Sequence, residues 1–173
     1  MTDKPAFSTT DLCPEASQLV TQLEMQAHPE GGFYKRCFTS ATEIETPWGP
    51  RPSATMIYYL LPQGAFSQWH RLRQQEVWMY QAGDPVLLHS INPSAELDSR
   101  VIGPGAGHHR EWCINGGDWF AAEPCPDPQY GYTLASCMVT PGFDFADFEL
   151  GDKASLCHAY PAFDSYFRRL CRD

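Results

Sequence analysis

The sequence has few basic residues and no long hydrophobic run, and both absences narrow the classes of function. It holds 12 lysines and arginines against 21 aspartates and glutamates, which gives a formal net charge of -9. An acidic surface repels nucleic-acid phosphates and anionic lipids, so we expect neither nucleic acid nor a membrane as a partner. The longest apolar stretches, such as 56–61, have the length of a strand and not of a membrane span. The polar N-terminus lacks the apolar core of a signal peptide, which predicts a cytoplasmic protein.

Paired cysteine motifs are also missing. The seven cysteines are scattered along the chain, and no two of them are spaced C-x-x-C. Free thiols in a reducing compartment are therefore a simpler interpretation than a disulfide framework or a zinc site. The glycine-rich stretch 103–107 lacks the Lys-Ser/Thr ending of a phosphate-binding loop.

The composition is that of one globular domain. The chain has 173 residues, of which 43% are hydrophobic and 13% aromatic. Apolar residues recur at helical spacing over 14–25, where Pro14 suits a first helical turn, so one helix is predicted near the N-terminus. We expect a flexible tail over 1–12, a main domain over 13–150, and a C-terminal extension over 151–173 that contains a short helix.

The rest of the main domain reads as short strands. Apolar, aromatic-rich runs are separated by Pro, Gly, Asn and Asp, which are turn residues. The predicted strands are 33–39, 55–61, 66–72, 76–81, 86–91, 100–102, 112–114, 119–122 and 132–140. About nine short strands behind one helix indicate an all-β sandwich or barrel and not a βαβ fold.

The stretch 64–83 carries the clearest chemical signal. It contains His70 at the end of one predicted strand and Glu76 at the start of the next. Because residues two apart on a strand share a face, a hairpin would bring His70 and Glu76 together inside the barrel, with Trp78 and Tyr80 on the same face as Glu76. An imidazole beside a carboxylate in a buried site is an arrangement in which both pKa values shift, as general acids and bases require.

The same stretch resembles the first motif of the cupin superfamily, G-(x)5-H-x-H-(x)3-E-(x)6-G. Leu72 stands where metal-binding cupins carry the second histidine. The best match to the second motif, P-x-G-x-x-H, is 115–120, with Phe120 in the histidine place. The resemblance implies a double-stranded β-helix, the cupin jelly-roll barrel. It also implies that only two of the four usual metal ligands, His70 and Glu76, are present. We therefore expect no metal cofactor, and any divalent metal would use those two residues.

Further segments resemble one small cupin subfamily of unknown function (Cupin_5-like), whose fold is similar to that of dTDP-4-dehydrorhamnose 3,5-epimerase. These segments are HPEGGFYKR at 28–36, IYYLL at 57–61, FSQWHR at 66–71, EVWMYQAGDP at 76–85 and PGFDFADFEL at 141–150. The sequence departs from the subfamily at Met79 and Asn115. The epimerase's catalytic residues cannot be placed here, so its activity is not carried over. By analogy with cupins, a homodimer is expected.

Several residues are candidate ligand contacts. Tyr34 and Arg36 alternate onto one strand face after two glycines, and an inward arginine would suit a carboxylate or phosphate; a solvated strand face is the alternative. The rings of Trp78, Tyr80 and Phe120 could stack on a ligand or simply fill the core. The segment around Phe145 is predicted to cap the barrel or the mouth of the pocket.

Three functions fit these residues. The first is an isomerase, epimerase or lyase acting on a small polar, sugar-like or carboxylate compound, with His70 as general base oriented by Glu76. The second is a non-catalytic protein that binds a small molecule in the same pocket. The third is a metal-dependent oxygenase, which ranks last because Leu72 and Phe120 remove two ligands, although His89 could replace one. The plainer interpretations remain open: His70 could be a core histidine bonded to the backbone, and Glu76 could lie in solvent.

Overall fold

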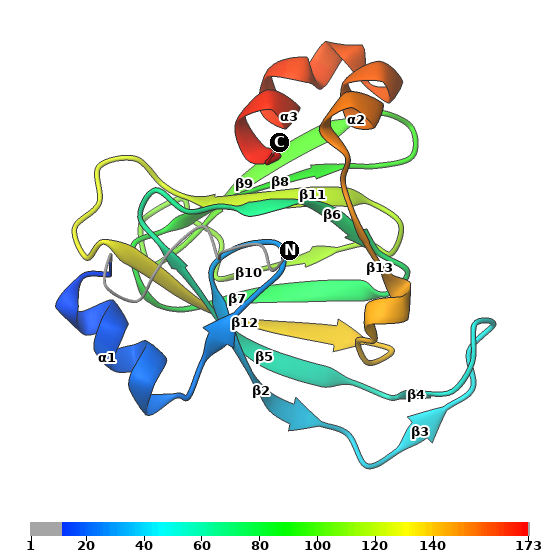
Figure 1. Cartoon of the computed structure of the whole chain (residues 1–173), viewed down its shortest axis with the longest axis horizontal. Helices are drawn as coiled ribbons and strands as arrows, with labels where there is room; N and C mark the ends of the chain where they lie inside the picture. The colour runs from blue at the N-terminus through cyan, green and yellow to red at the C-terminus, as the bar shows by residue number, and fades with distance from the viewer. Residues whose placement is uncertain (1–11, 173) are drawn as a thin grey trace, which may run out of the picture.

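The computed structural model describes residues 12–172, which form two antiparallel sheets stacked face to face (Figure 1). The first sheet has the order β1-β2-β5-β12-β7-β10, with bounds Gln26–Ala27, Phe33–Thr39, Thr55–Pro62, Tyr132–Thr140, Gln75–Gly83 and Glu111–Ile114. The second has the order β13-β6-β11-β8-β9, with bounds Phe148–Leu150, Ser67–Leu72, Trp119–Pro124, Val86–Ile91 and Leu97–Ile102. A short hairpin, β3 (Glu43–Ile44) and β4 (Arg51–Pro52), projects beyond the sheets. The predicted all-β class is confirmed.

The helix before the sheets also agrees with the sequence, apart from its end. Helix α1 spans Pro14–Gln22 and packs its buried face, which includes Ala16 and Val20, against the first sheet. It ends three residues before the predicted Met25 because Glu24 takes φ 51°, in the left-handed region that a helix cannot contain. The chain then turns directly into β1.

The interior between the sheets is solid at one end and open at the other. Along β5, period-two alternation points Ile57, Tyr59 and Leu61 inward; Tyr59 and Leu61 belong to the buried core, whereas Ile57 lines a cavity. Along β7 the same alternation leads from Glu76, in the cavity, to Trp78, in the core. The cavity therefore lies where β5 and β7 begin.

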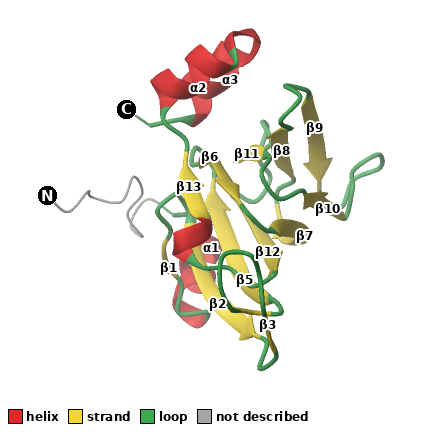
Figure 2. Cartoon of the chain, turned by 90° about the vertical axis from the view of Figure 1, so that its right-hand side faces the viewer, coloured by secondary structure: helices red, strands yellow, loops and turns green. Residues whose placement is uncertain are grey.

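The C-terminal segment is more regular than the predicted single short helix. Helix α2 (Lys153–Ala159), the 3-10 turn η3 (Pro161–Phe163) and helix α3 (Asp164–Leu170) lie against the outer face of the second sheet (Figure 2). The Asp152 side chain accepts a hydrogen bond from the Ser155 N–H and caps α2. Buried Phe167 packs edge-on against buried Trp69 of β6, which ties this segment to the sheet.

Two expectations about the chain ends remain predictions. The flexible tail predicted over 1–12 falls outside the described residues, except for Leu12. The division between a main domain and a C-terminal extension is a prediction too. Among residues 12–172, no helix has the length and apolar character needed to cross a membrane.

Candidate functional site

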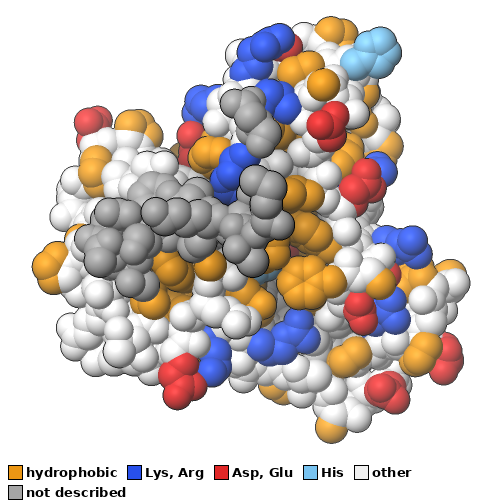
Figure 3. Space-filling view, viewed as in Figure 1, with side chains coloured by type: hydrophobic (Ala, Val, Ile, Leu, Met, Phe, Trp, Pro, Cys, Tyr) orange, Lys and Arg blue, Asp and Glu red, His pale blue; other side chains and the backbone are white. Residues whose placement is uncertain are grey.

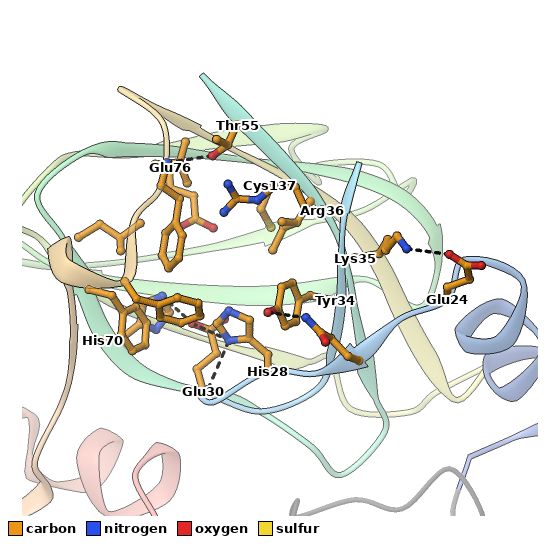
Figure 4. A pocket seen from close by; sticks show the side chains of 17 residues that line it. Glu24, His28, Glu30, Tyr34, Lys35, Arg36, Thr55, His70, Glu76 and Cys137 are labelled. Carbon is orange, nitrogen blue, oxygen red and sulfur yellow. Dashed lines mark hydrogen bonds and ion pairs between the residues drawn. The ribbon is translucent and has the colours of Figure 1, made fainter. Parts of the chain in front are cut away.

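A cavity of about 400 Å³ opens between the sheets, and most of the chemically interesting side chains gather there (Figure 4). Its walls come from the loop before β2, from β2 itself, and from β5, β6, β7 and β12. The segment 143–148 closes it from the side. The volume lies near the lower end of the range of about 300–1,000 Å³ that is common for small-molecule sites.

On one side of the cavity, two histidines flank one carboxylate. His70 of β6 places Nε2 3.1 Å from Glu30 Oε2, and His28 places Nδ1 3.6 Å from the same oxygen. The other oxygen of Glu30 accepts a hydrogen bond of 3.0 Å from the Ser67 hydroxyl. Glu30 and His70 are 5% and 1% exposed. The carboxylate partner of His70 is thus Glu30, and not Glu76 as the hairpin argument suggested.

The hydrogen bonds fix where protons lie in this group. His70 Nδ1 lies 2.7 Å from the carbonyl oxygen of Gln68, and because a carbonyl can only accept, Nδ1 donates. A proton must also lie between His70 Nε2 and Glu30, since two bare acceptors would repel each other. Both nitrogens of the His70 ring are therefore engaged. His28 Nδ1 accepts a hydrogen bond from the Glu30 N–H at 3.4 Å, so a neutral His28 carries its proton on Nε2.

Electrostatics keeps Glu30 ionised. Burial raises the pKa of the Glu30 carboxyl, but the adjacent His70 and His28 and the Ser67 hydroxyl outweigh burial and leave that pKa below its ordinary value. The pKa of His28 is lowered, chiefly by burial; the Glu30 charge opposes this shift and the nearby His70 adds to it. At neutral pH this side of the cavity therefore presents a carboxylate and a neutral imidazole.

A second carboxyl, Glu76 at the start of β7, has the opposite character. It is 7% exposed, and it forms no ion pair with another of the described residues. Burial, followed by the negative charge of Glu30, raises the pKa of Glu76 from its ordinary 4.5 to about 8, although the Cys137 thiol favours the ionised form. The thiol of Cys137 has its own pKa raised well above the ordinary value, mainly by burial and then by the Glu76 charge. At pH 7 Glu76 is therefore a neutral acid that can donate a proton.

Strand β2 supplies the polar rim. Lys35 Nζ pairs with Glu24 Oε2 at 2.8 Å, and the Tyr34 hydroxyl accepts a hydrogen bond of 2.7 Å from Gln26. Figure 4 shows the Arg36 side chain extending from β2 into the cavity, on the side where Glu76 and Cys137 lie. Arg36 contacts the ring of Phe143, whose centroid is 5.8 Å from its Cζ.

Three phenylalanines cover one side of the cavity, in the segment that the sequence predicts as a cap. Phe143, Phe145 and Phe148 form a mutually edge-on cluster with ring centroids 4.9–6.2 Å apart. Strand β13 pairs with β6, so Phe148 lies 5.4 Å from the His70 ring, centroid to centroid. The Phe145 ring is half exposed at 52% and stands at the outer edge of the cluster.

The sequence-predicted residues thus divide into two sets. Those that line the cavity are His70, Glu76, Tyr34, Arg36 and Phe145. Those that do not line it are Trp78, Tyr80 and Phe120.

Each of the three rings outside the cavity has a structural contact. Trp78 is buried in the core, edge-on to Tyr59 at 5.3 Å. Tyr80 donates its hydroxyl proton to the Gly83 carbonyl at 2.7 Å. Phe120 is paired with His70 across the β11–β6 ladder, and its ring packs against the His70 ring with the two centroids 4.0 Å apart. The alternation of residues along β7 correctly predicted which side chains point inward. It does not tell whether an inward side chain lies in the cavity or in the packed core.

Sequence reasoning missed His28 and Glu30. Both lie in the HPEGG segment, directly before two glycines with positive φ, Gly31 at 121° and Gly32 at 66°. Histidine and glutamate two residues apart before such a turn were the available signal, but their approach to His70 depends on tertiary structure. His89 lies elsewhere: it contacts Ser99 at 2.7 Å and Glu123 at 3.3 Å, beneath α3.

The donor set does not fit a cupin metal centre. At two of the four motif positions the side chains are hydrocarbon, Leu72 and Phe120, and His70 Nε2 is already engaged by Glu30. Within the part of the chain that the structure describes, no group of three or more His, Cys, Asp or Glu side chains is placed to hold a metal ion.

Comparison with known proteins places the chain among cupins. The family model Cupin_5, described as cupin superfamily (DUF985), matches residues 17–151. A hypothetical protein from Leishmania major is 32% identical, with a TM-score of 0.85, over 91% of this chain and 99% of that chain. A crystal structure of a Shewanella oneidensis protein is 33% identical, with a TM-score of 0.83, over 91% and 97% of the two chains. No curated protein matches in sequence.

More distant structures share the fold alone. An oxalate decarboxylase from Bacillus subtilis has a TM-score of 0.56 and 10% identity, over 99% of this chain and 40% of that chain. At that identity the similarity shows architecture and not activity. Together with the family match, it confirms the jelly-roll barrel that the motif spacing implied.

Proposed function

The chain belongs to the Cupin_5 family of the cupin superfamily, and we propose that its cavity binds a small carbonyl compound and moves a proton on the carbon beside the carbonyl group. The reaction class is isomerisation or epimerisation. One observation carries the proposal: two buried carboxyl groups face the same cavity, and their environments push their pKa values in opposite directions. Such a pair provides a base and an acid at the same pH.

We assign the base to Glu30 and not to His70. Both ring nitrogens of His70 are already hydrogen-bonded, so its ring has no free lone pair for a substrate proton. Each Glu30 oxygen keeps one lone pair after accepting from His70 and Ser67. His70 then acts as a positioning residue that holds the carboxylate ionised and oriented.

Glu76 supplies the acid. A neutral carboxylic acid in a buried site can hydrogen-bond a carbonyl oxygen and stabilise the negative charge that develops on it. The Glu76 proton is retained at neutral pH because burial raises the pKa of this group to about 8.

The step balances without an oxidant or a reductant. Glu30 removes a proton from the carbon next to the carbonyl, and the electron pair of the broken C–H bond forms a carbon–carbon double bond. The carbonyl π pair moves to oxygen, which takes the Glu76 proton, and an enol results. In the return step Glu30 delivers its proton to carbon, and a hydroxyl of the enol gives a proton back to Glu76. Delivery to the same carbon, after the enol has turned its other face to Glu30, gives an epimer. Delivery to the former carbonyl carbon of an enediol gives an isomer.

Deuterium exchange tests the proposal directly. The protein is incubated in D2O with a panel of 2-oxo acids, hydroxy ketones and aldoses, and loss of the C–H signal beside the carbonyl is followed by proton NMR. We expect exchange with at least one compound, and a decrease of about 10²-fold or more in Glu30→Gln, the size of a typical general-base contribution.

A matched control separates this effect from general damage. Glu149, whose side chain is 54% exposed and pairs with Arg71 outside the cavity, is the control carboxylate. The Glu149→Gln protein should exchange like the wild type. If the wild type binds a compound of the panel but exchanges no deuterium into it, and no variant does so either, catalysis is contradicted and a non-catalytic binding protein is favoured.

A further inference from the structure

Arg36 differs from the other charged side chains of the cavity in how its charge is balanced. The other cation of the rim, Lys35, is neutralised by Glu24, and the carboxylate of Glu30 is matched by His70. For Arg36, by contrast, the described residues provide a contact with the Phe143 ring but no acidic partner. The guanidinium reaches into the cavity while the residue as a whole stays accessible to solvent (Figure 4). A planar guanidinium in this position can bind a carboxylate through two parallel hydrogen bonds.

One part of the cavity wall is apolar, and the rest is polar or charged. Its hydrocarbon surface comes from Ile57, Leu72, Val139, Phe143, Phe145 and Phe148. In the space-filling view, orange side chains gather beside the central hollow, and basic side chains lie near them (Figure 3). A sugar, with a hydroxyl on nearly every carbon, would leave those hydroxyl groups without partners against this surface. The apolar part of the wall therefore favours a ligand that carries a short hydrocarbon group.

The balance of charge favours one negative charge on that ligand. Arg36 offers a single uncompensated positive charge, because the Glu30 carboxylate in the same cavity is already matched by His70. A phosphate ester carries about 1.5–2 negative charges at neutral pH, so Arg36 alone would leave part of its charge without a cationic partner. A carboxylate carries one.

From these observations we propose that the natural ligand is a small oxo acid, with its carboxylate on Arg36, its carbonyl oxygen on Glu76 and its hydrocarbon body against the phenylalanine cluster. The proposal rests on the proposed function for the role of the carbonyl group, but binding through Arg36 can be tested without catalysis. Under this proposal, Arg36 is the residue that selects the substrate class.

Calorimetric titration with matched probes tests this assignment. The probes are 2-oxo acids from pyruvate to 4-methyl-2-oxopentanoate, the methyl ester of each, and 3-methylbutyl phosphate. We expect at least one acid to bind the wild type about tenfold or more tightly than its ester and than the phosphate, as for a hydrogen-bonded ion pair. If every acid binds no more tightly than its ester, or if the phosphate binds best, the proposal is wrong.

Neighbouring variants on β2 locate the effect. Arg36→Gln should weaken binding of the acid about tenfold or more and leave ester binding unchanged, whereas Lys35→Gln should change acid binding less than about threefold. Arg36→Lys, which keeps the charge, should retain more affinity than Arg36→Gln. Equal acid binding by wild type and Arg36→Gln, or equal losses in Arg36→Gln and Lys35→Gln, would refute the assignment.

The two proposals fail separately. An oxo acid that binds through Arg36 without deuterium exchange would overturn the proton-transfer function and keep the ligand class. Exchange with neutral hydroxy ketones, in a protein that does not bind oxo acids, would overturn the ligand class and keep the function.

Discussion

Replacing Glu76 with glutamine should make the protein more stable at neutral pH, even though it removes a side chain placed in the site. The native protein holds a proton on Glu76 up to about pH 8, whereas the unfolded chain releases that proton near the ordinary pKa of 4.5. A group whose pKa is raised by folding contributes stability below the unfolded pKa and loses it as pH rises toward the folded pKa. Wild-type stability should therefore decrease between about pH 4.5 and pH 8.

The magnitude follows from the size of the shift. At about 1.4 kcal/mol per pKa unit, retaining the proton at pH 7.5 costs about 4 kcal/mol relative to a side chain that does not titrate, and most of that cost, about 3 kcal/mol, develops between pH 5 and pH 7.5. Glutamine is neutral at every pH and nearly the same size. The free energy of unfolding of Glu76→Gln relative to wild type should thus increase by about 3 kcal/mol over that interval.

Urea unfolding at pH 5 and pH 7.5 measures this difference. Groups that titrate equally in both proteins, such as His28, cancel in the comparison. Glu149→Gln, which removes an exposed carboxylate, should change stability by less than about 1 kcal/mol at both pH values. If wild type and Glu76→Gln show parallel dependence on pH, Glu76 is ionised in the native protein and the acid of the proposed reaction does not exist.

The same structure predicts three other outcomes. In Gly31→Ala the added Cβ would overlap the Phe66 carbonyl oxygen, whereas Gly107 also has positive φ but open space around it. In urea unfolding, Gly31→Ala should therefore destabilise the protein by about 1–3 kcal/mol more than Gly107→Ala; equal losses would contradict this packing. Phe167→Ala should lower the free energy of unfolding by about 3–5 kcal/mol, against less than about 1 kcal/mol for exposed Phe38→Ala; a small effect would mean that α3 is not part of the core. The deuterium-exchange rate should fall about tenfold per pH unit above about pH 8, as Glu76 ionises; a rate that keeps rising there would remove Glu76 from the mechanism.

The strands were predictable because their signals are local. Three of them, 33–39, 86–91 and 132–140, have the bounds that apolar runs and turn residues indicated. Such signals depend on neighbours along the chain, which a sequence displays directly. The end of α1 was misplaced because the left-handed conformation of Glu24 leaves no mark in the apolar pattern.

The site was predictable only in part. His70 and Glu76 line one cavity, as the hairpin argument required, because the spacing of a hairpin is fixed by local geometry. Glu30 became the partner of His70 across 40 positions of sequence, through a loop whose path no periodic pattern specifies. Trp78 has the predicted face but lies in solid core, because period-two alternation determines a side and the packing of both sheets determines the depth.

Carbon-13 NMR of protein labelled at the glutamate carboxyl carbons, titrated from pH 4 to pH 9, tests the central claim most directly. The two signals are assigned by their absence in Glu30→Gln and Glu76→Gln. The structure predicts that the Glu30 signal stays that of an ionised carboxylate down to below its ordinary pKa, while the Glu76 signal changes from acid to carboxylate near pH 8. Titration of both signals together near pH 4.5 would show two ordinary carboxylates and would contradict the acid–base pair on which the proposed function depends.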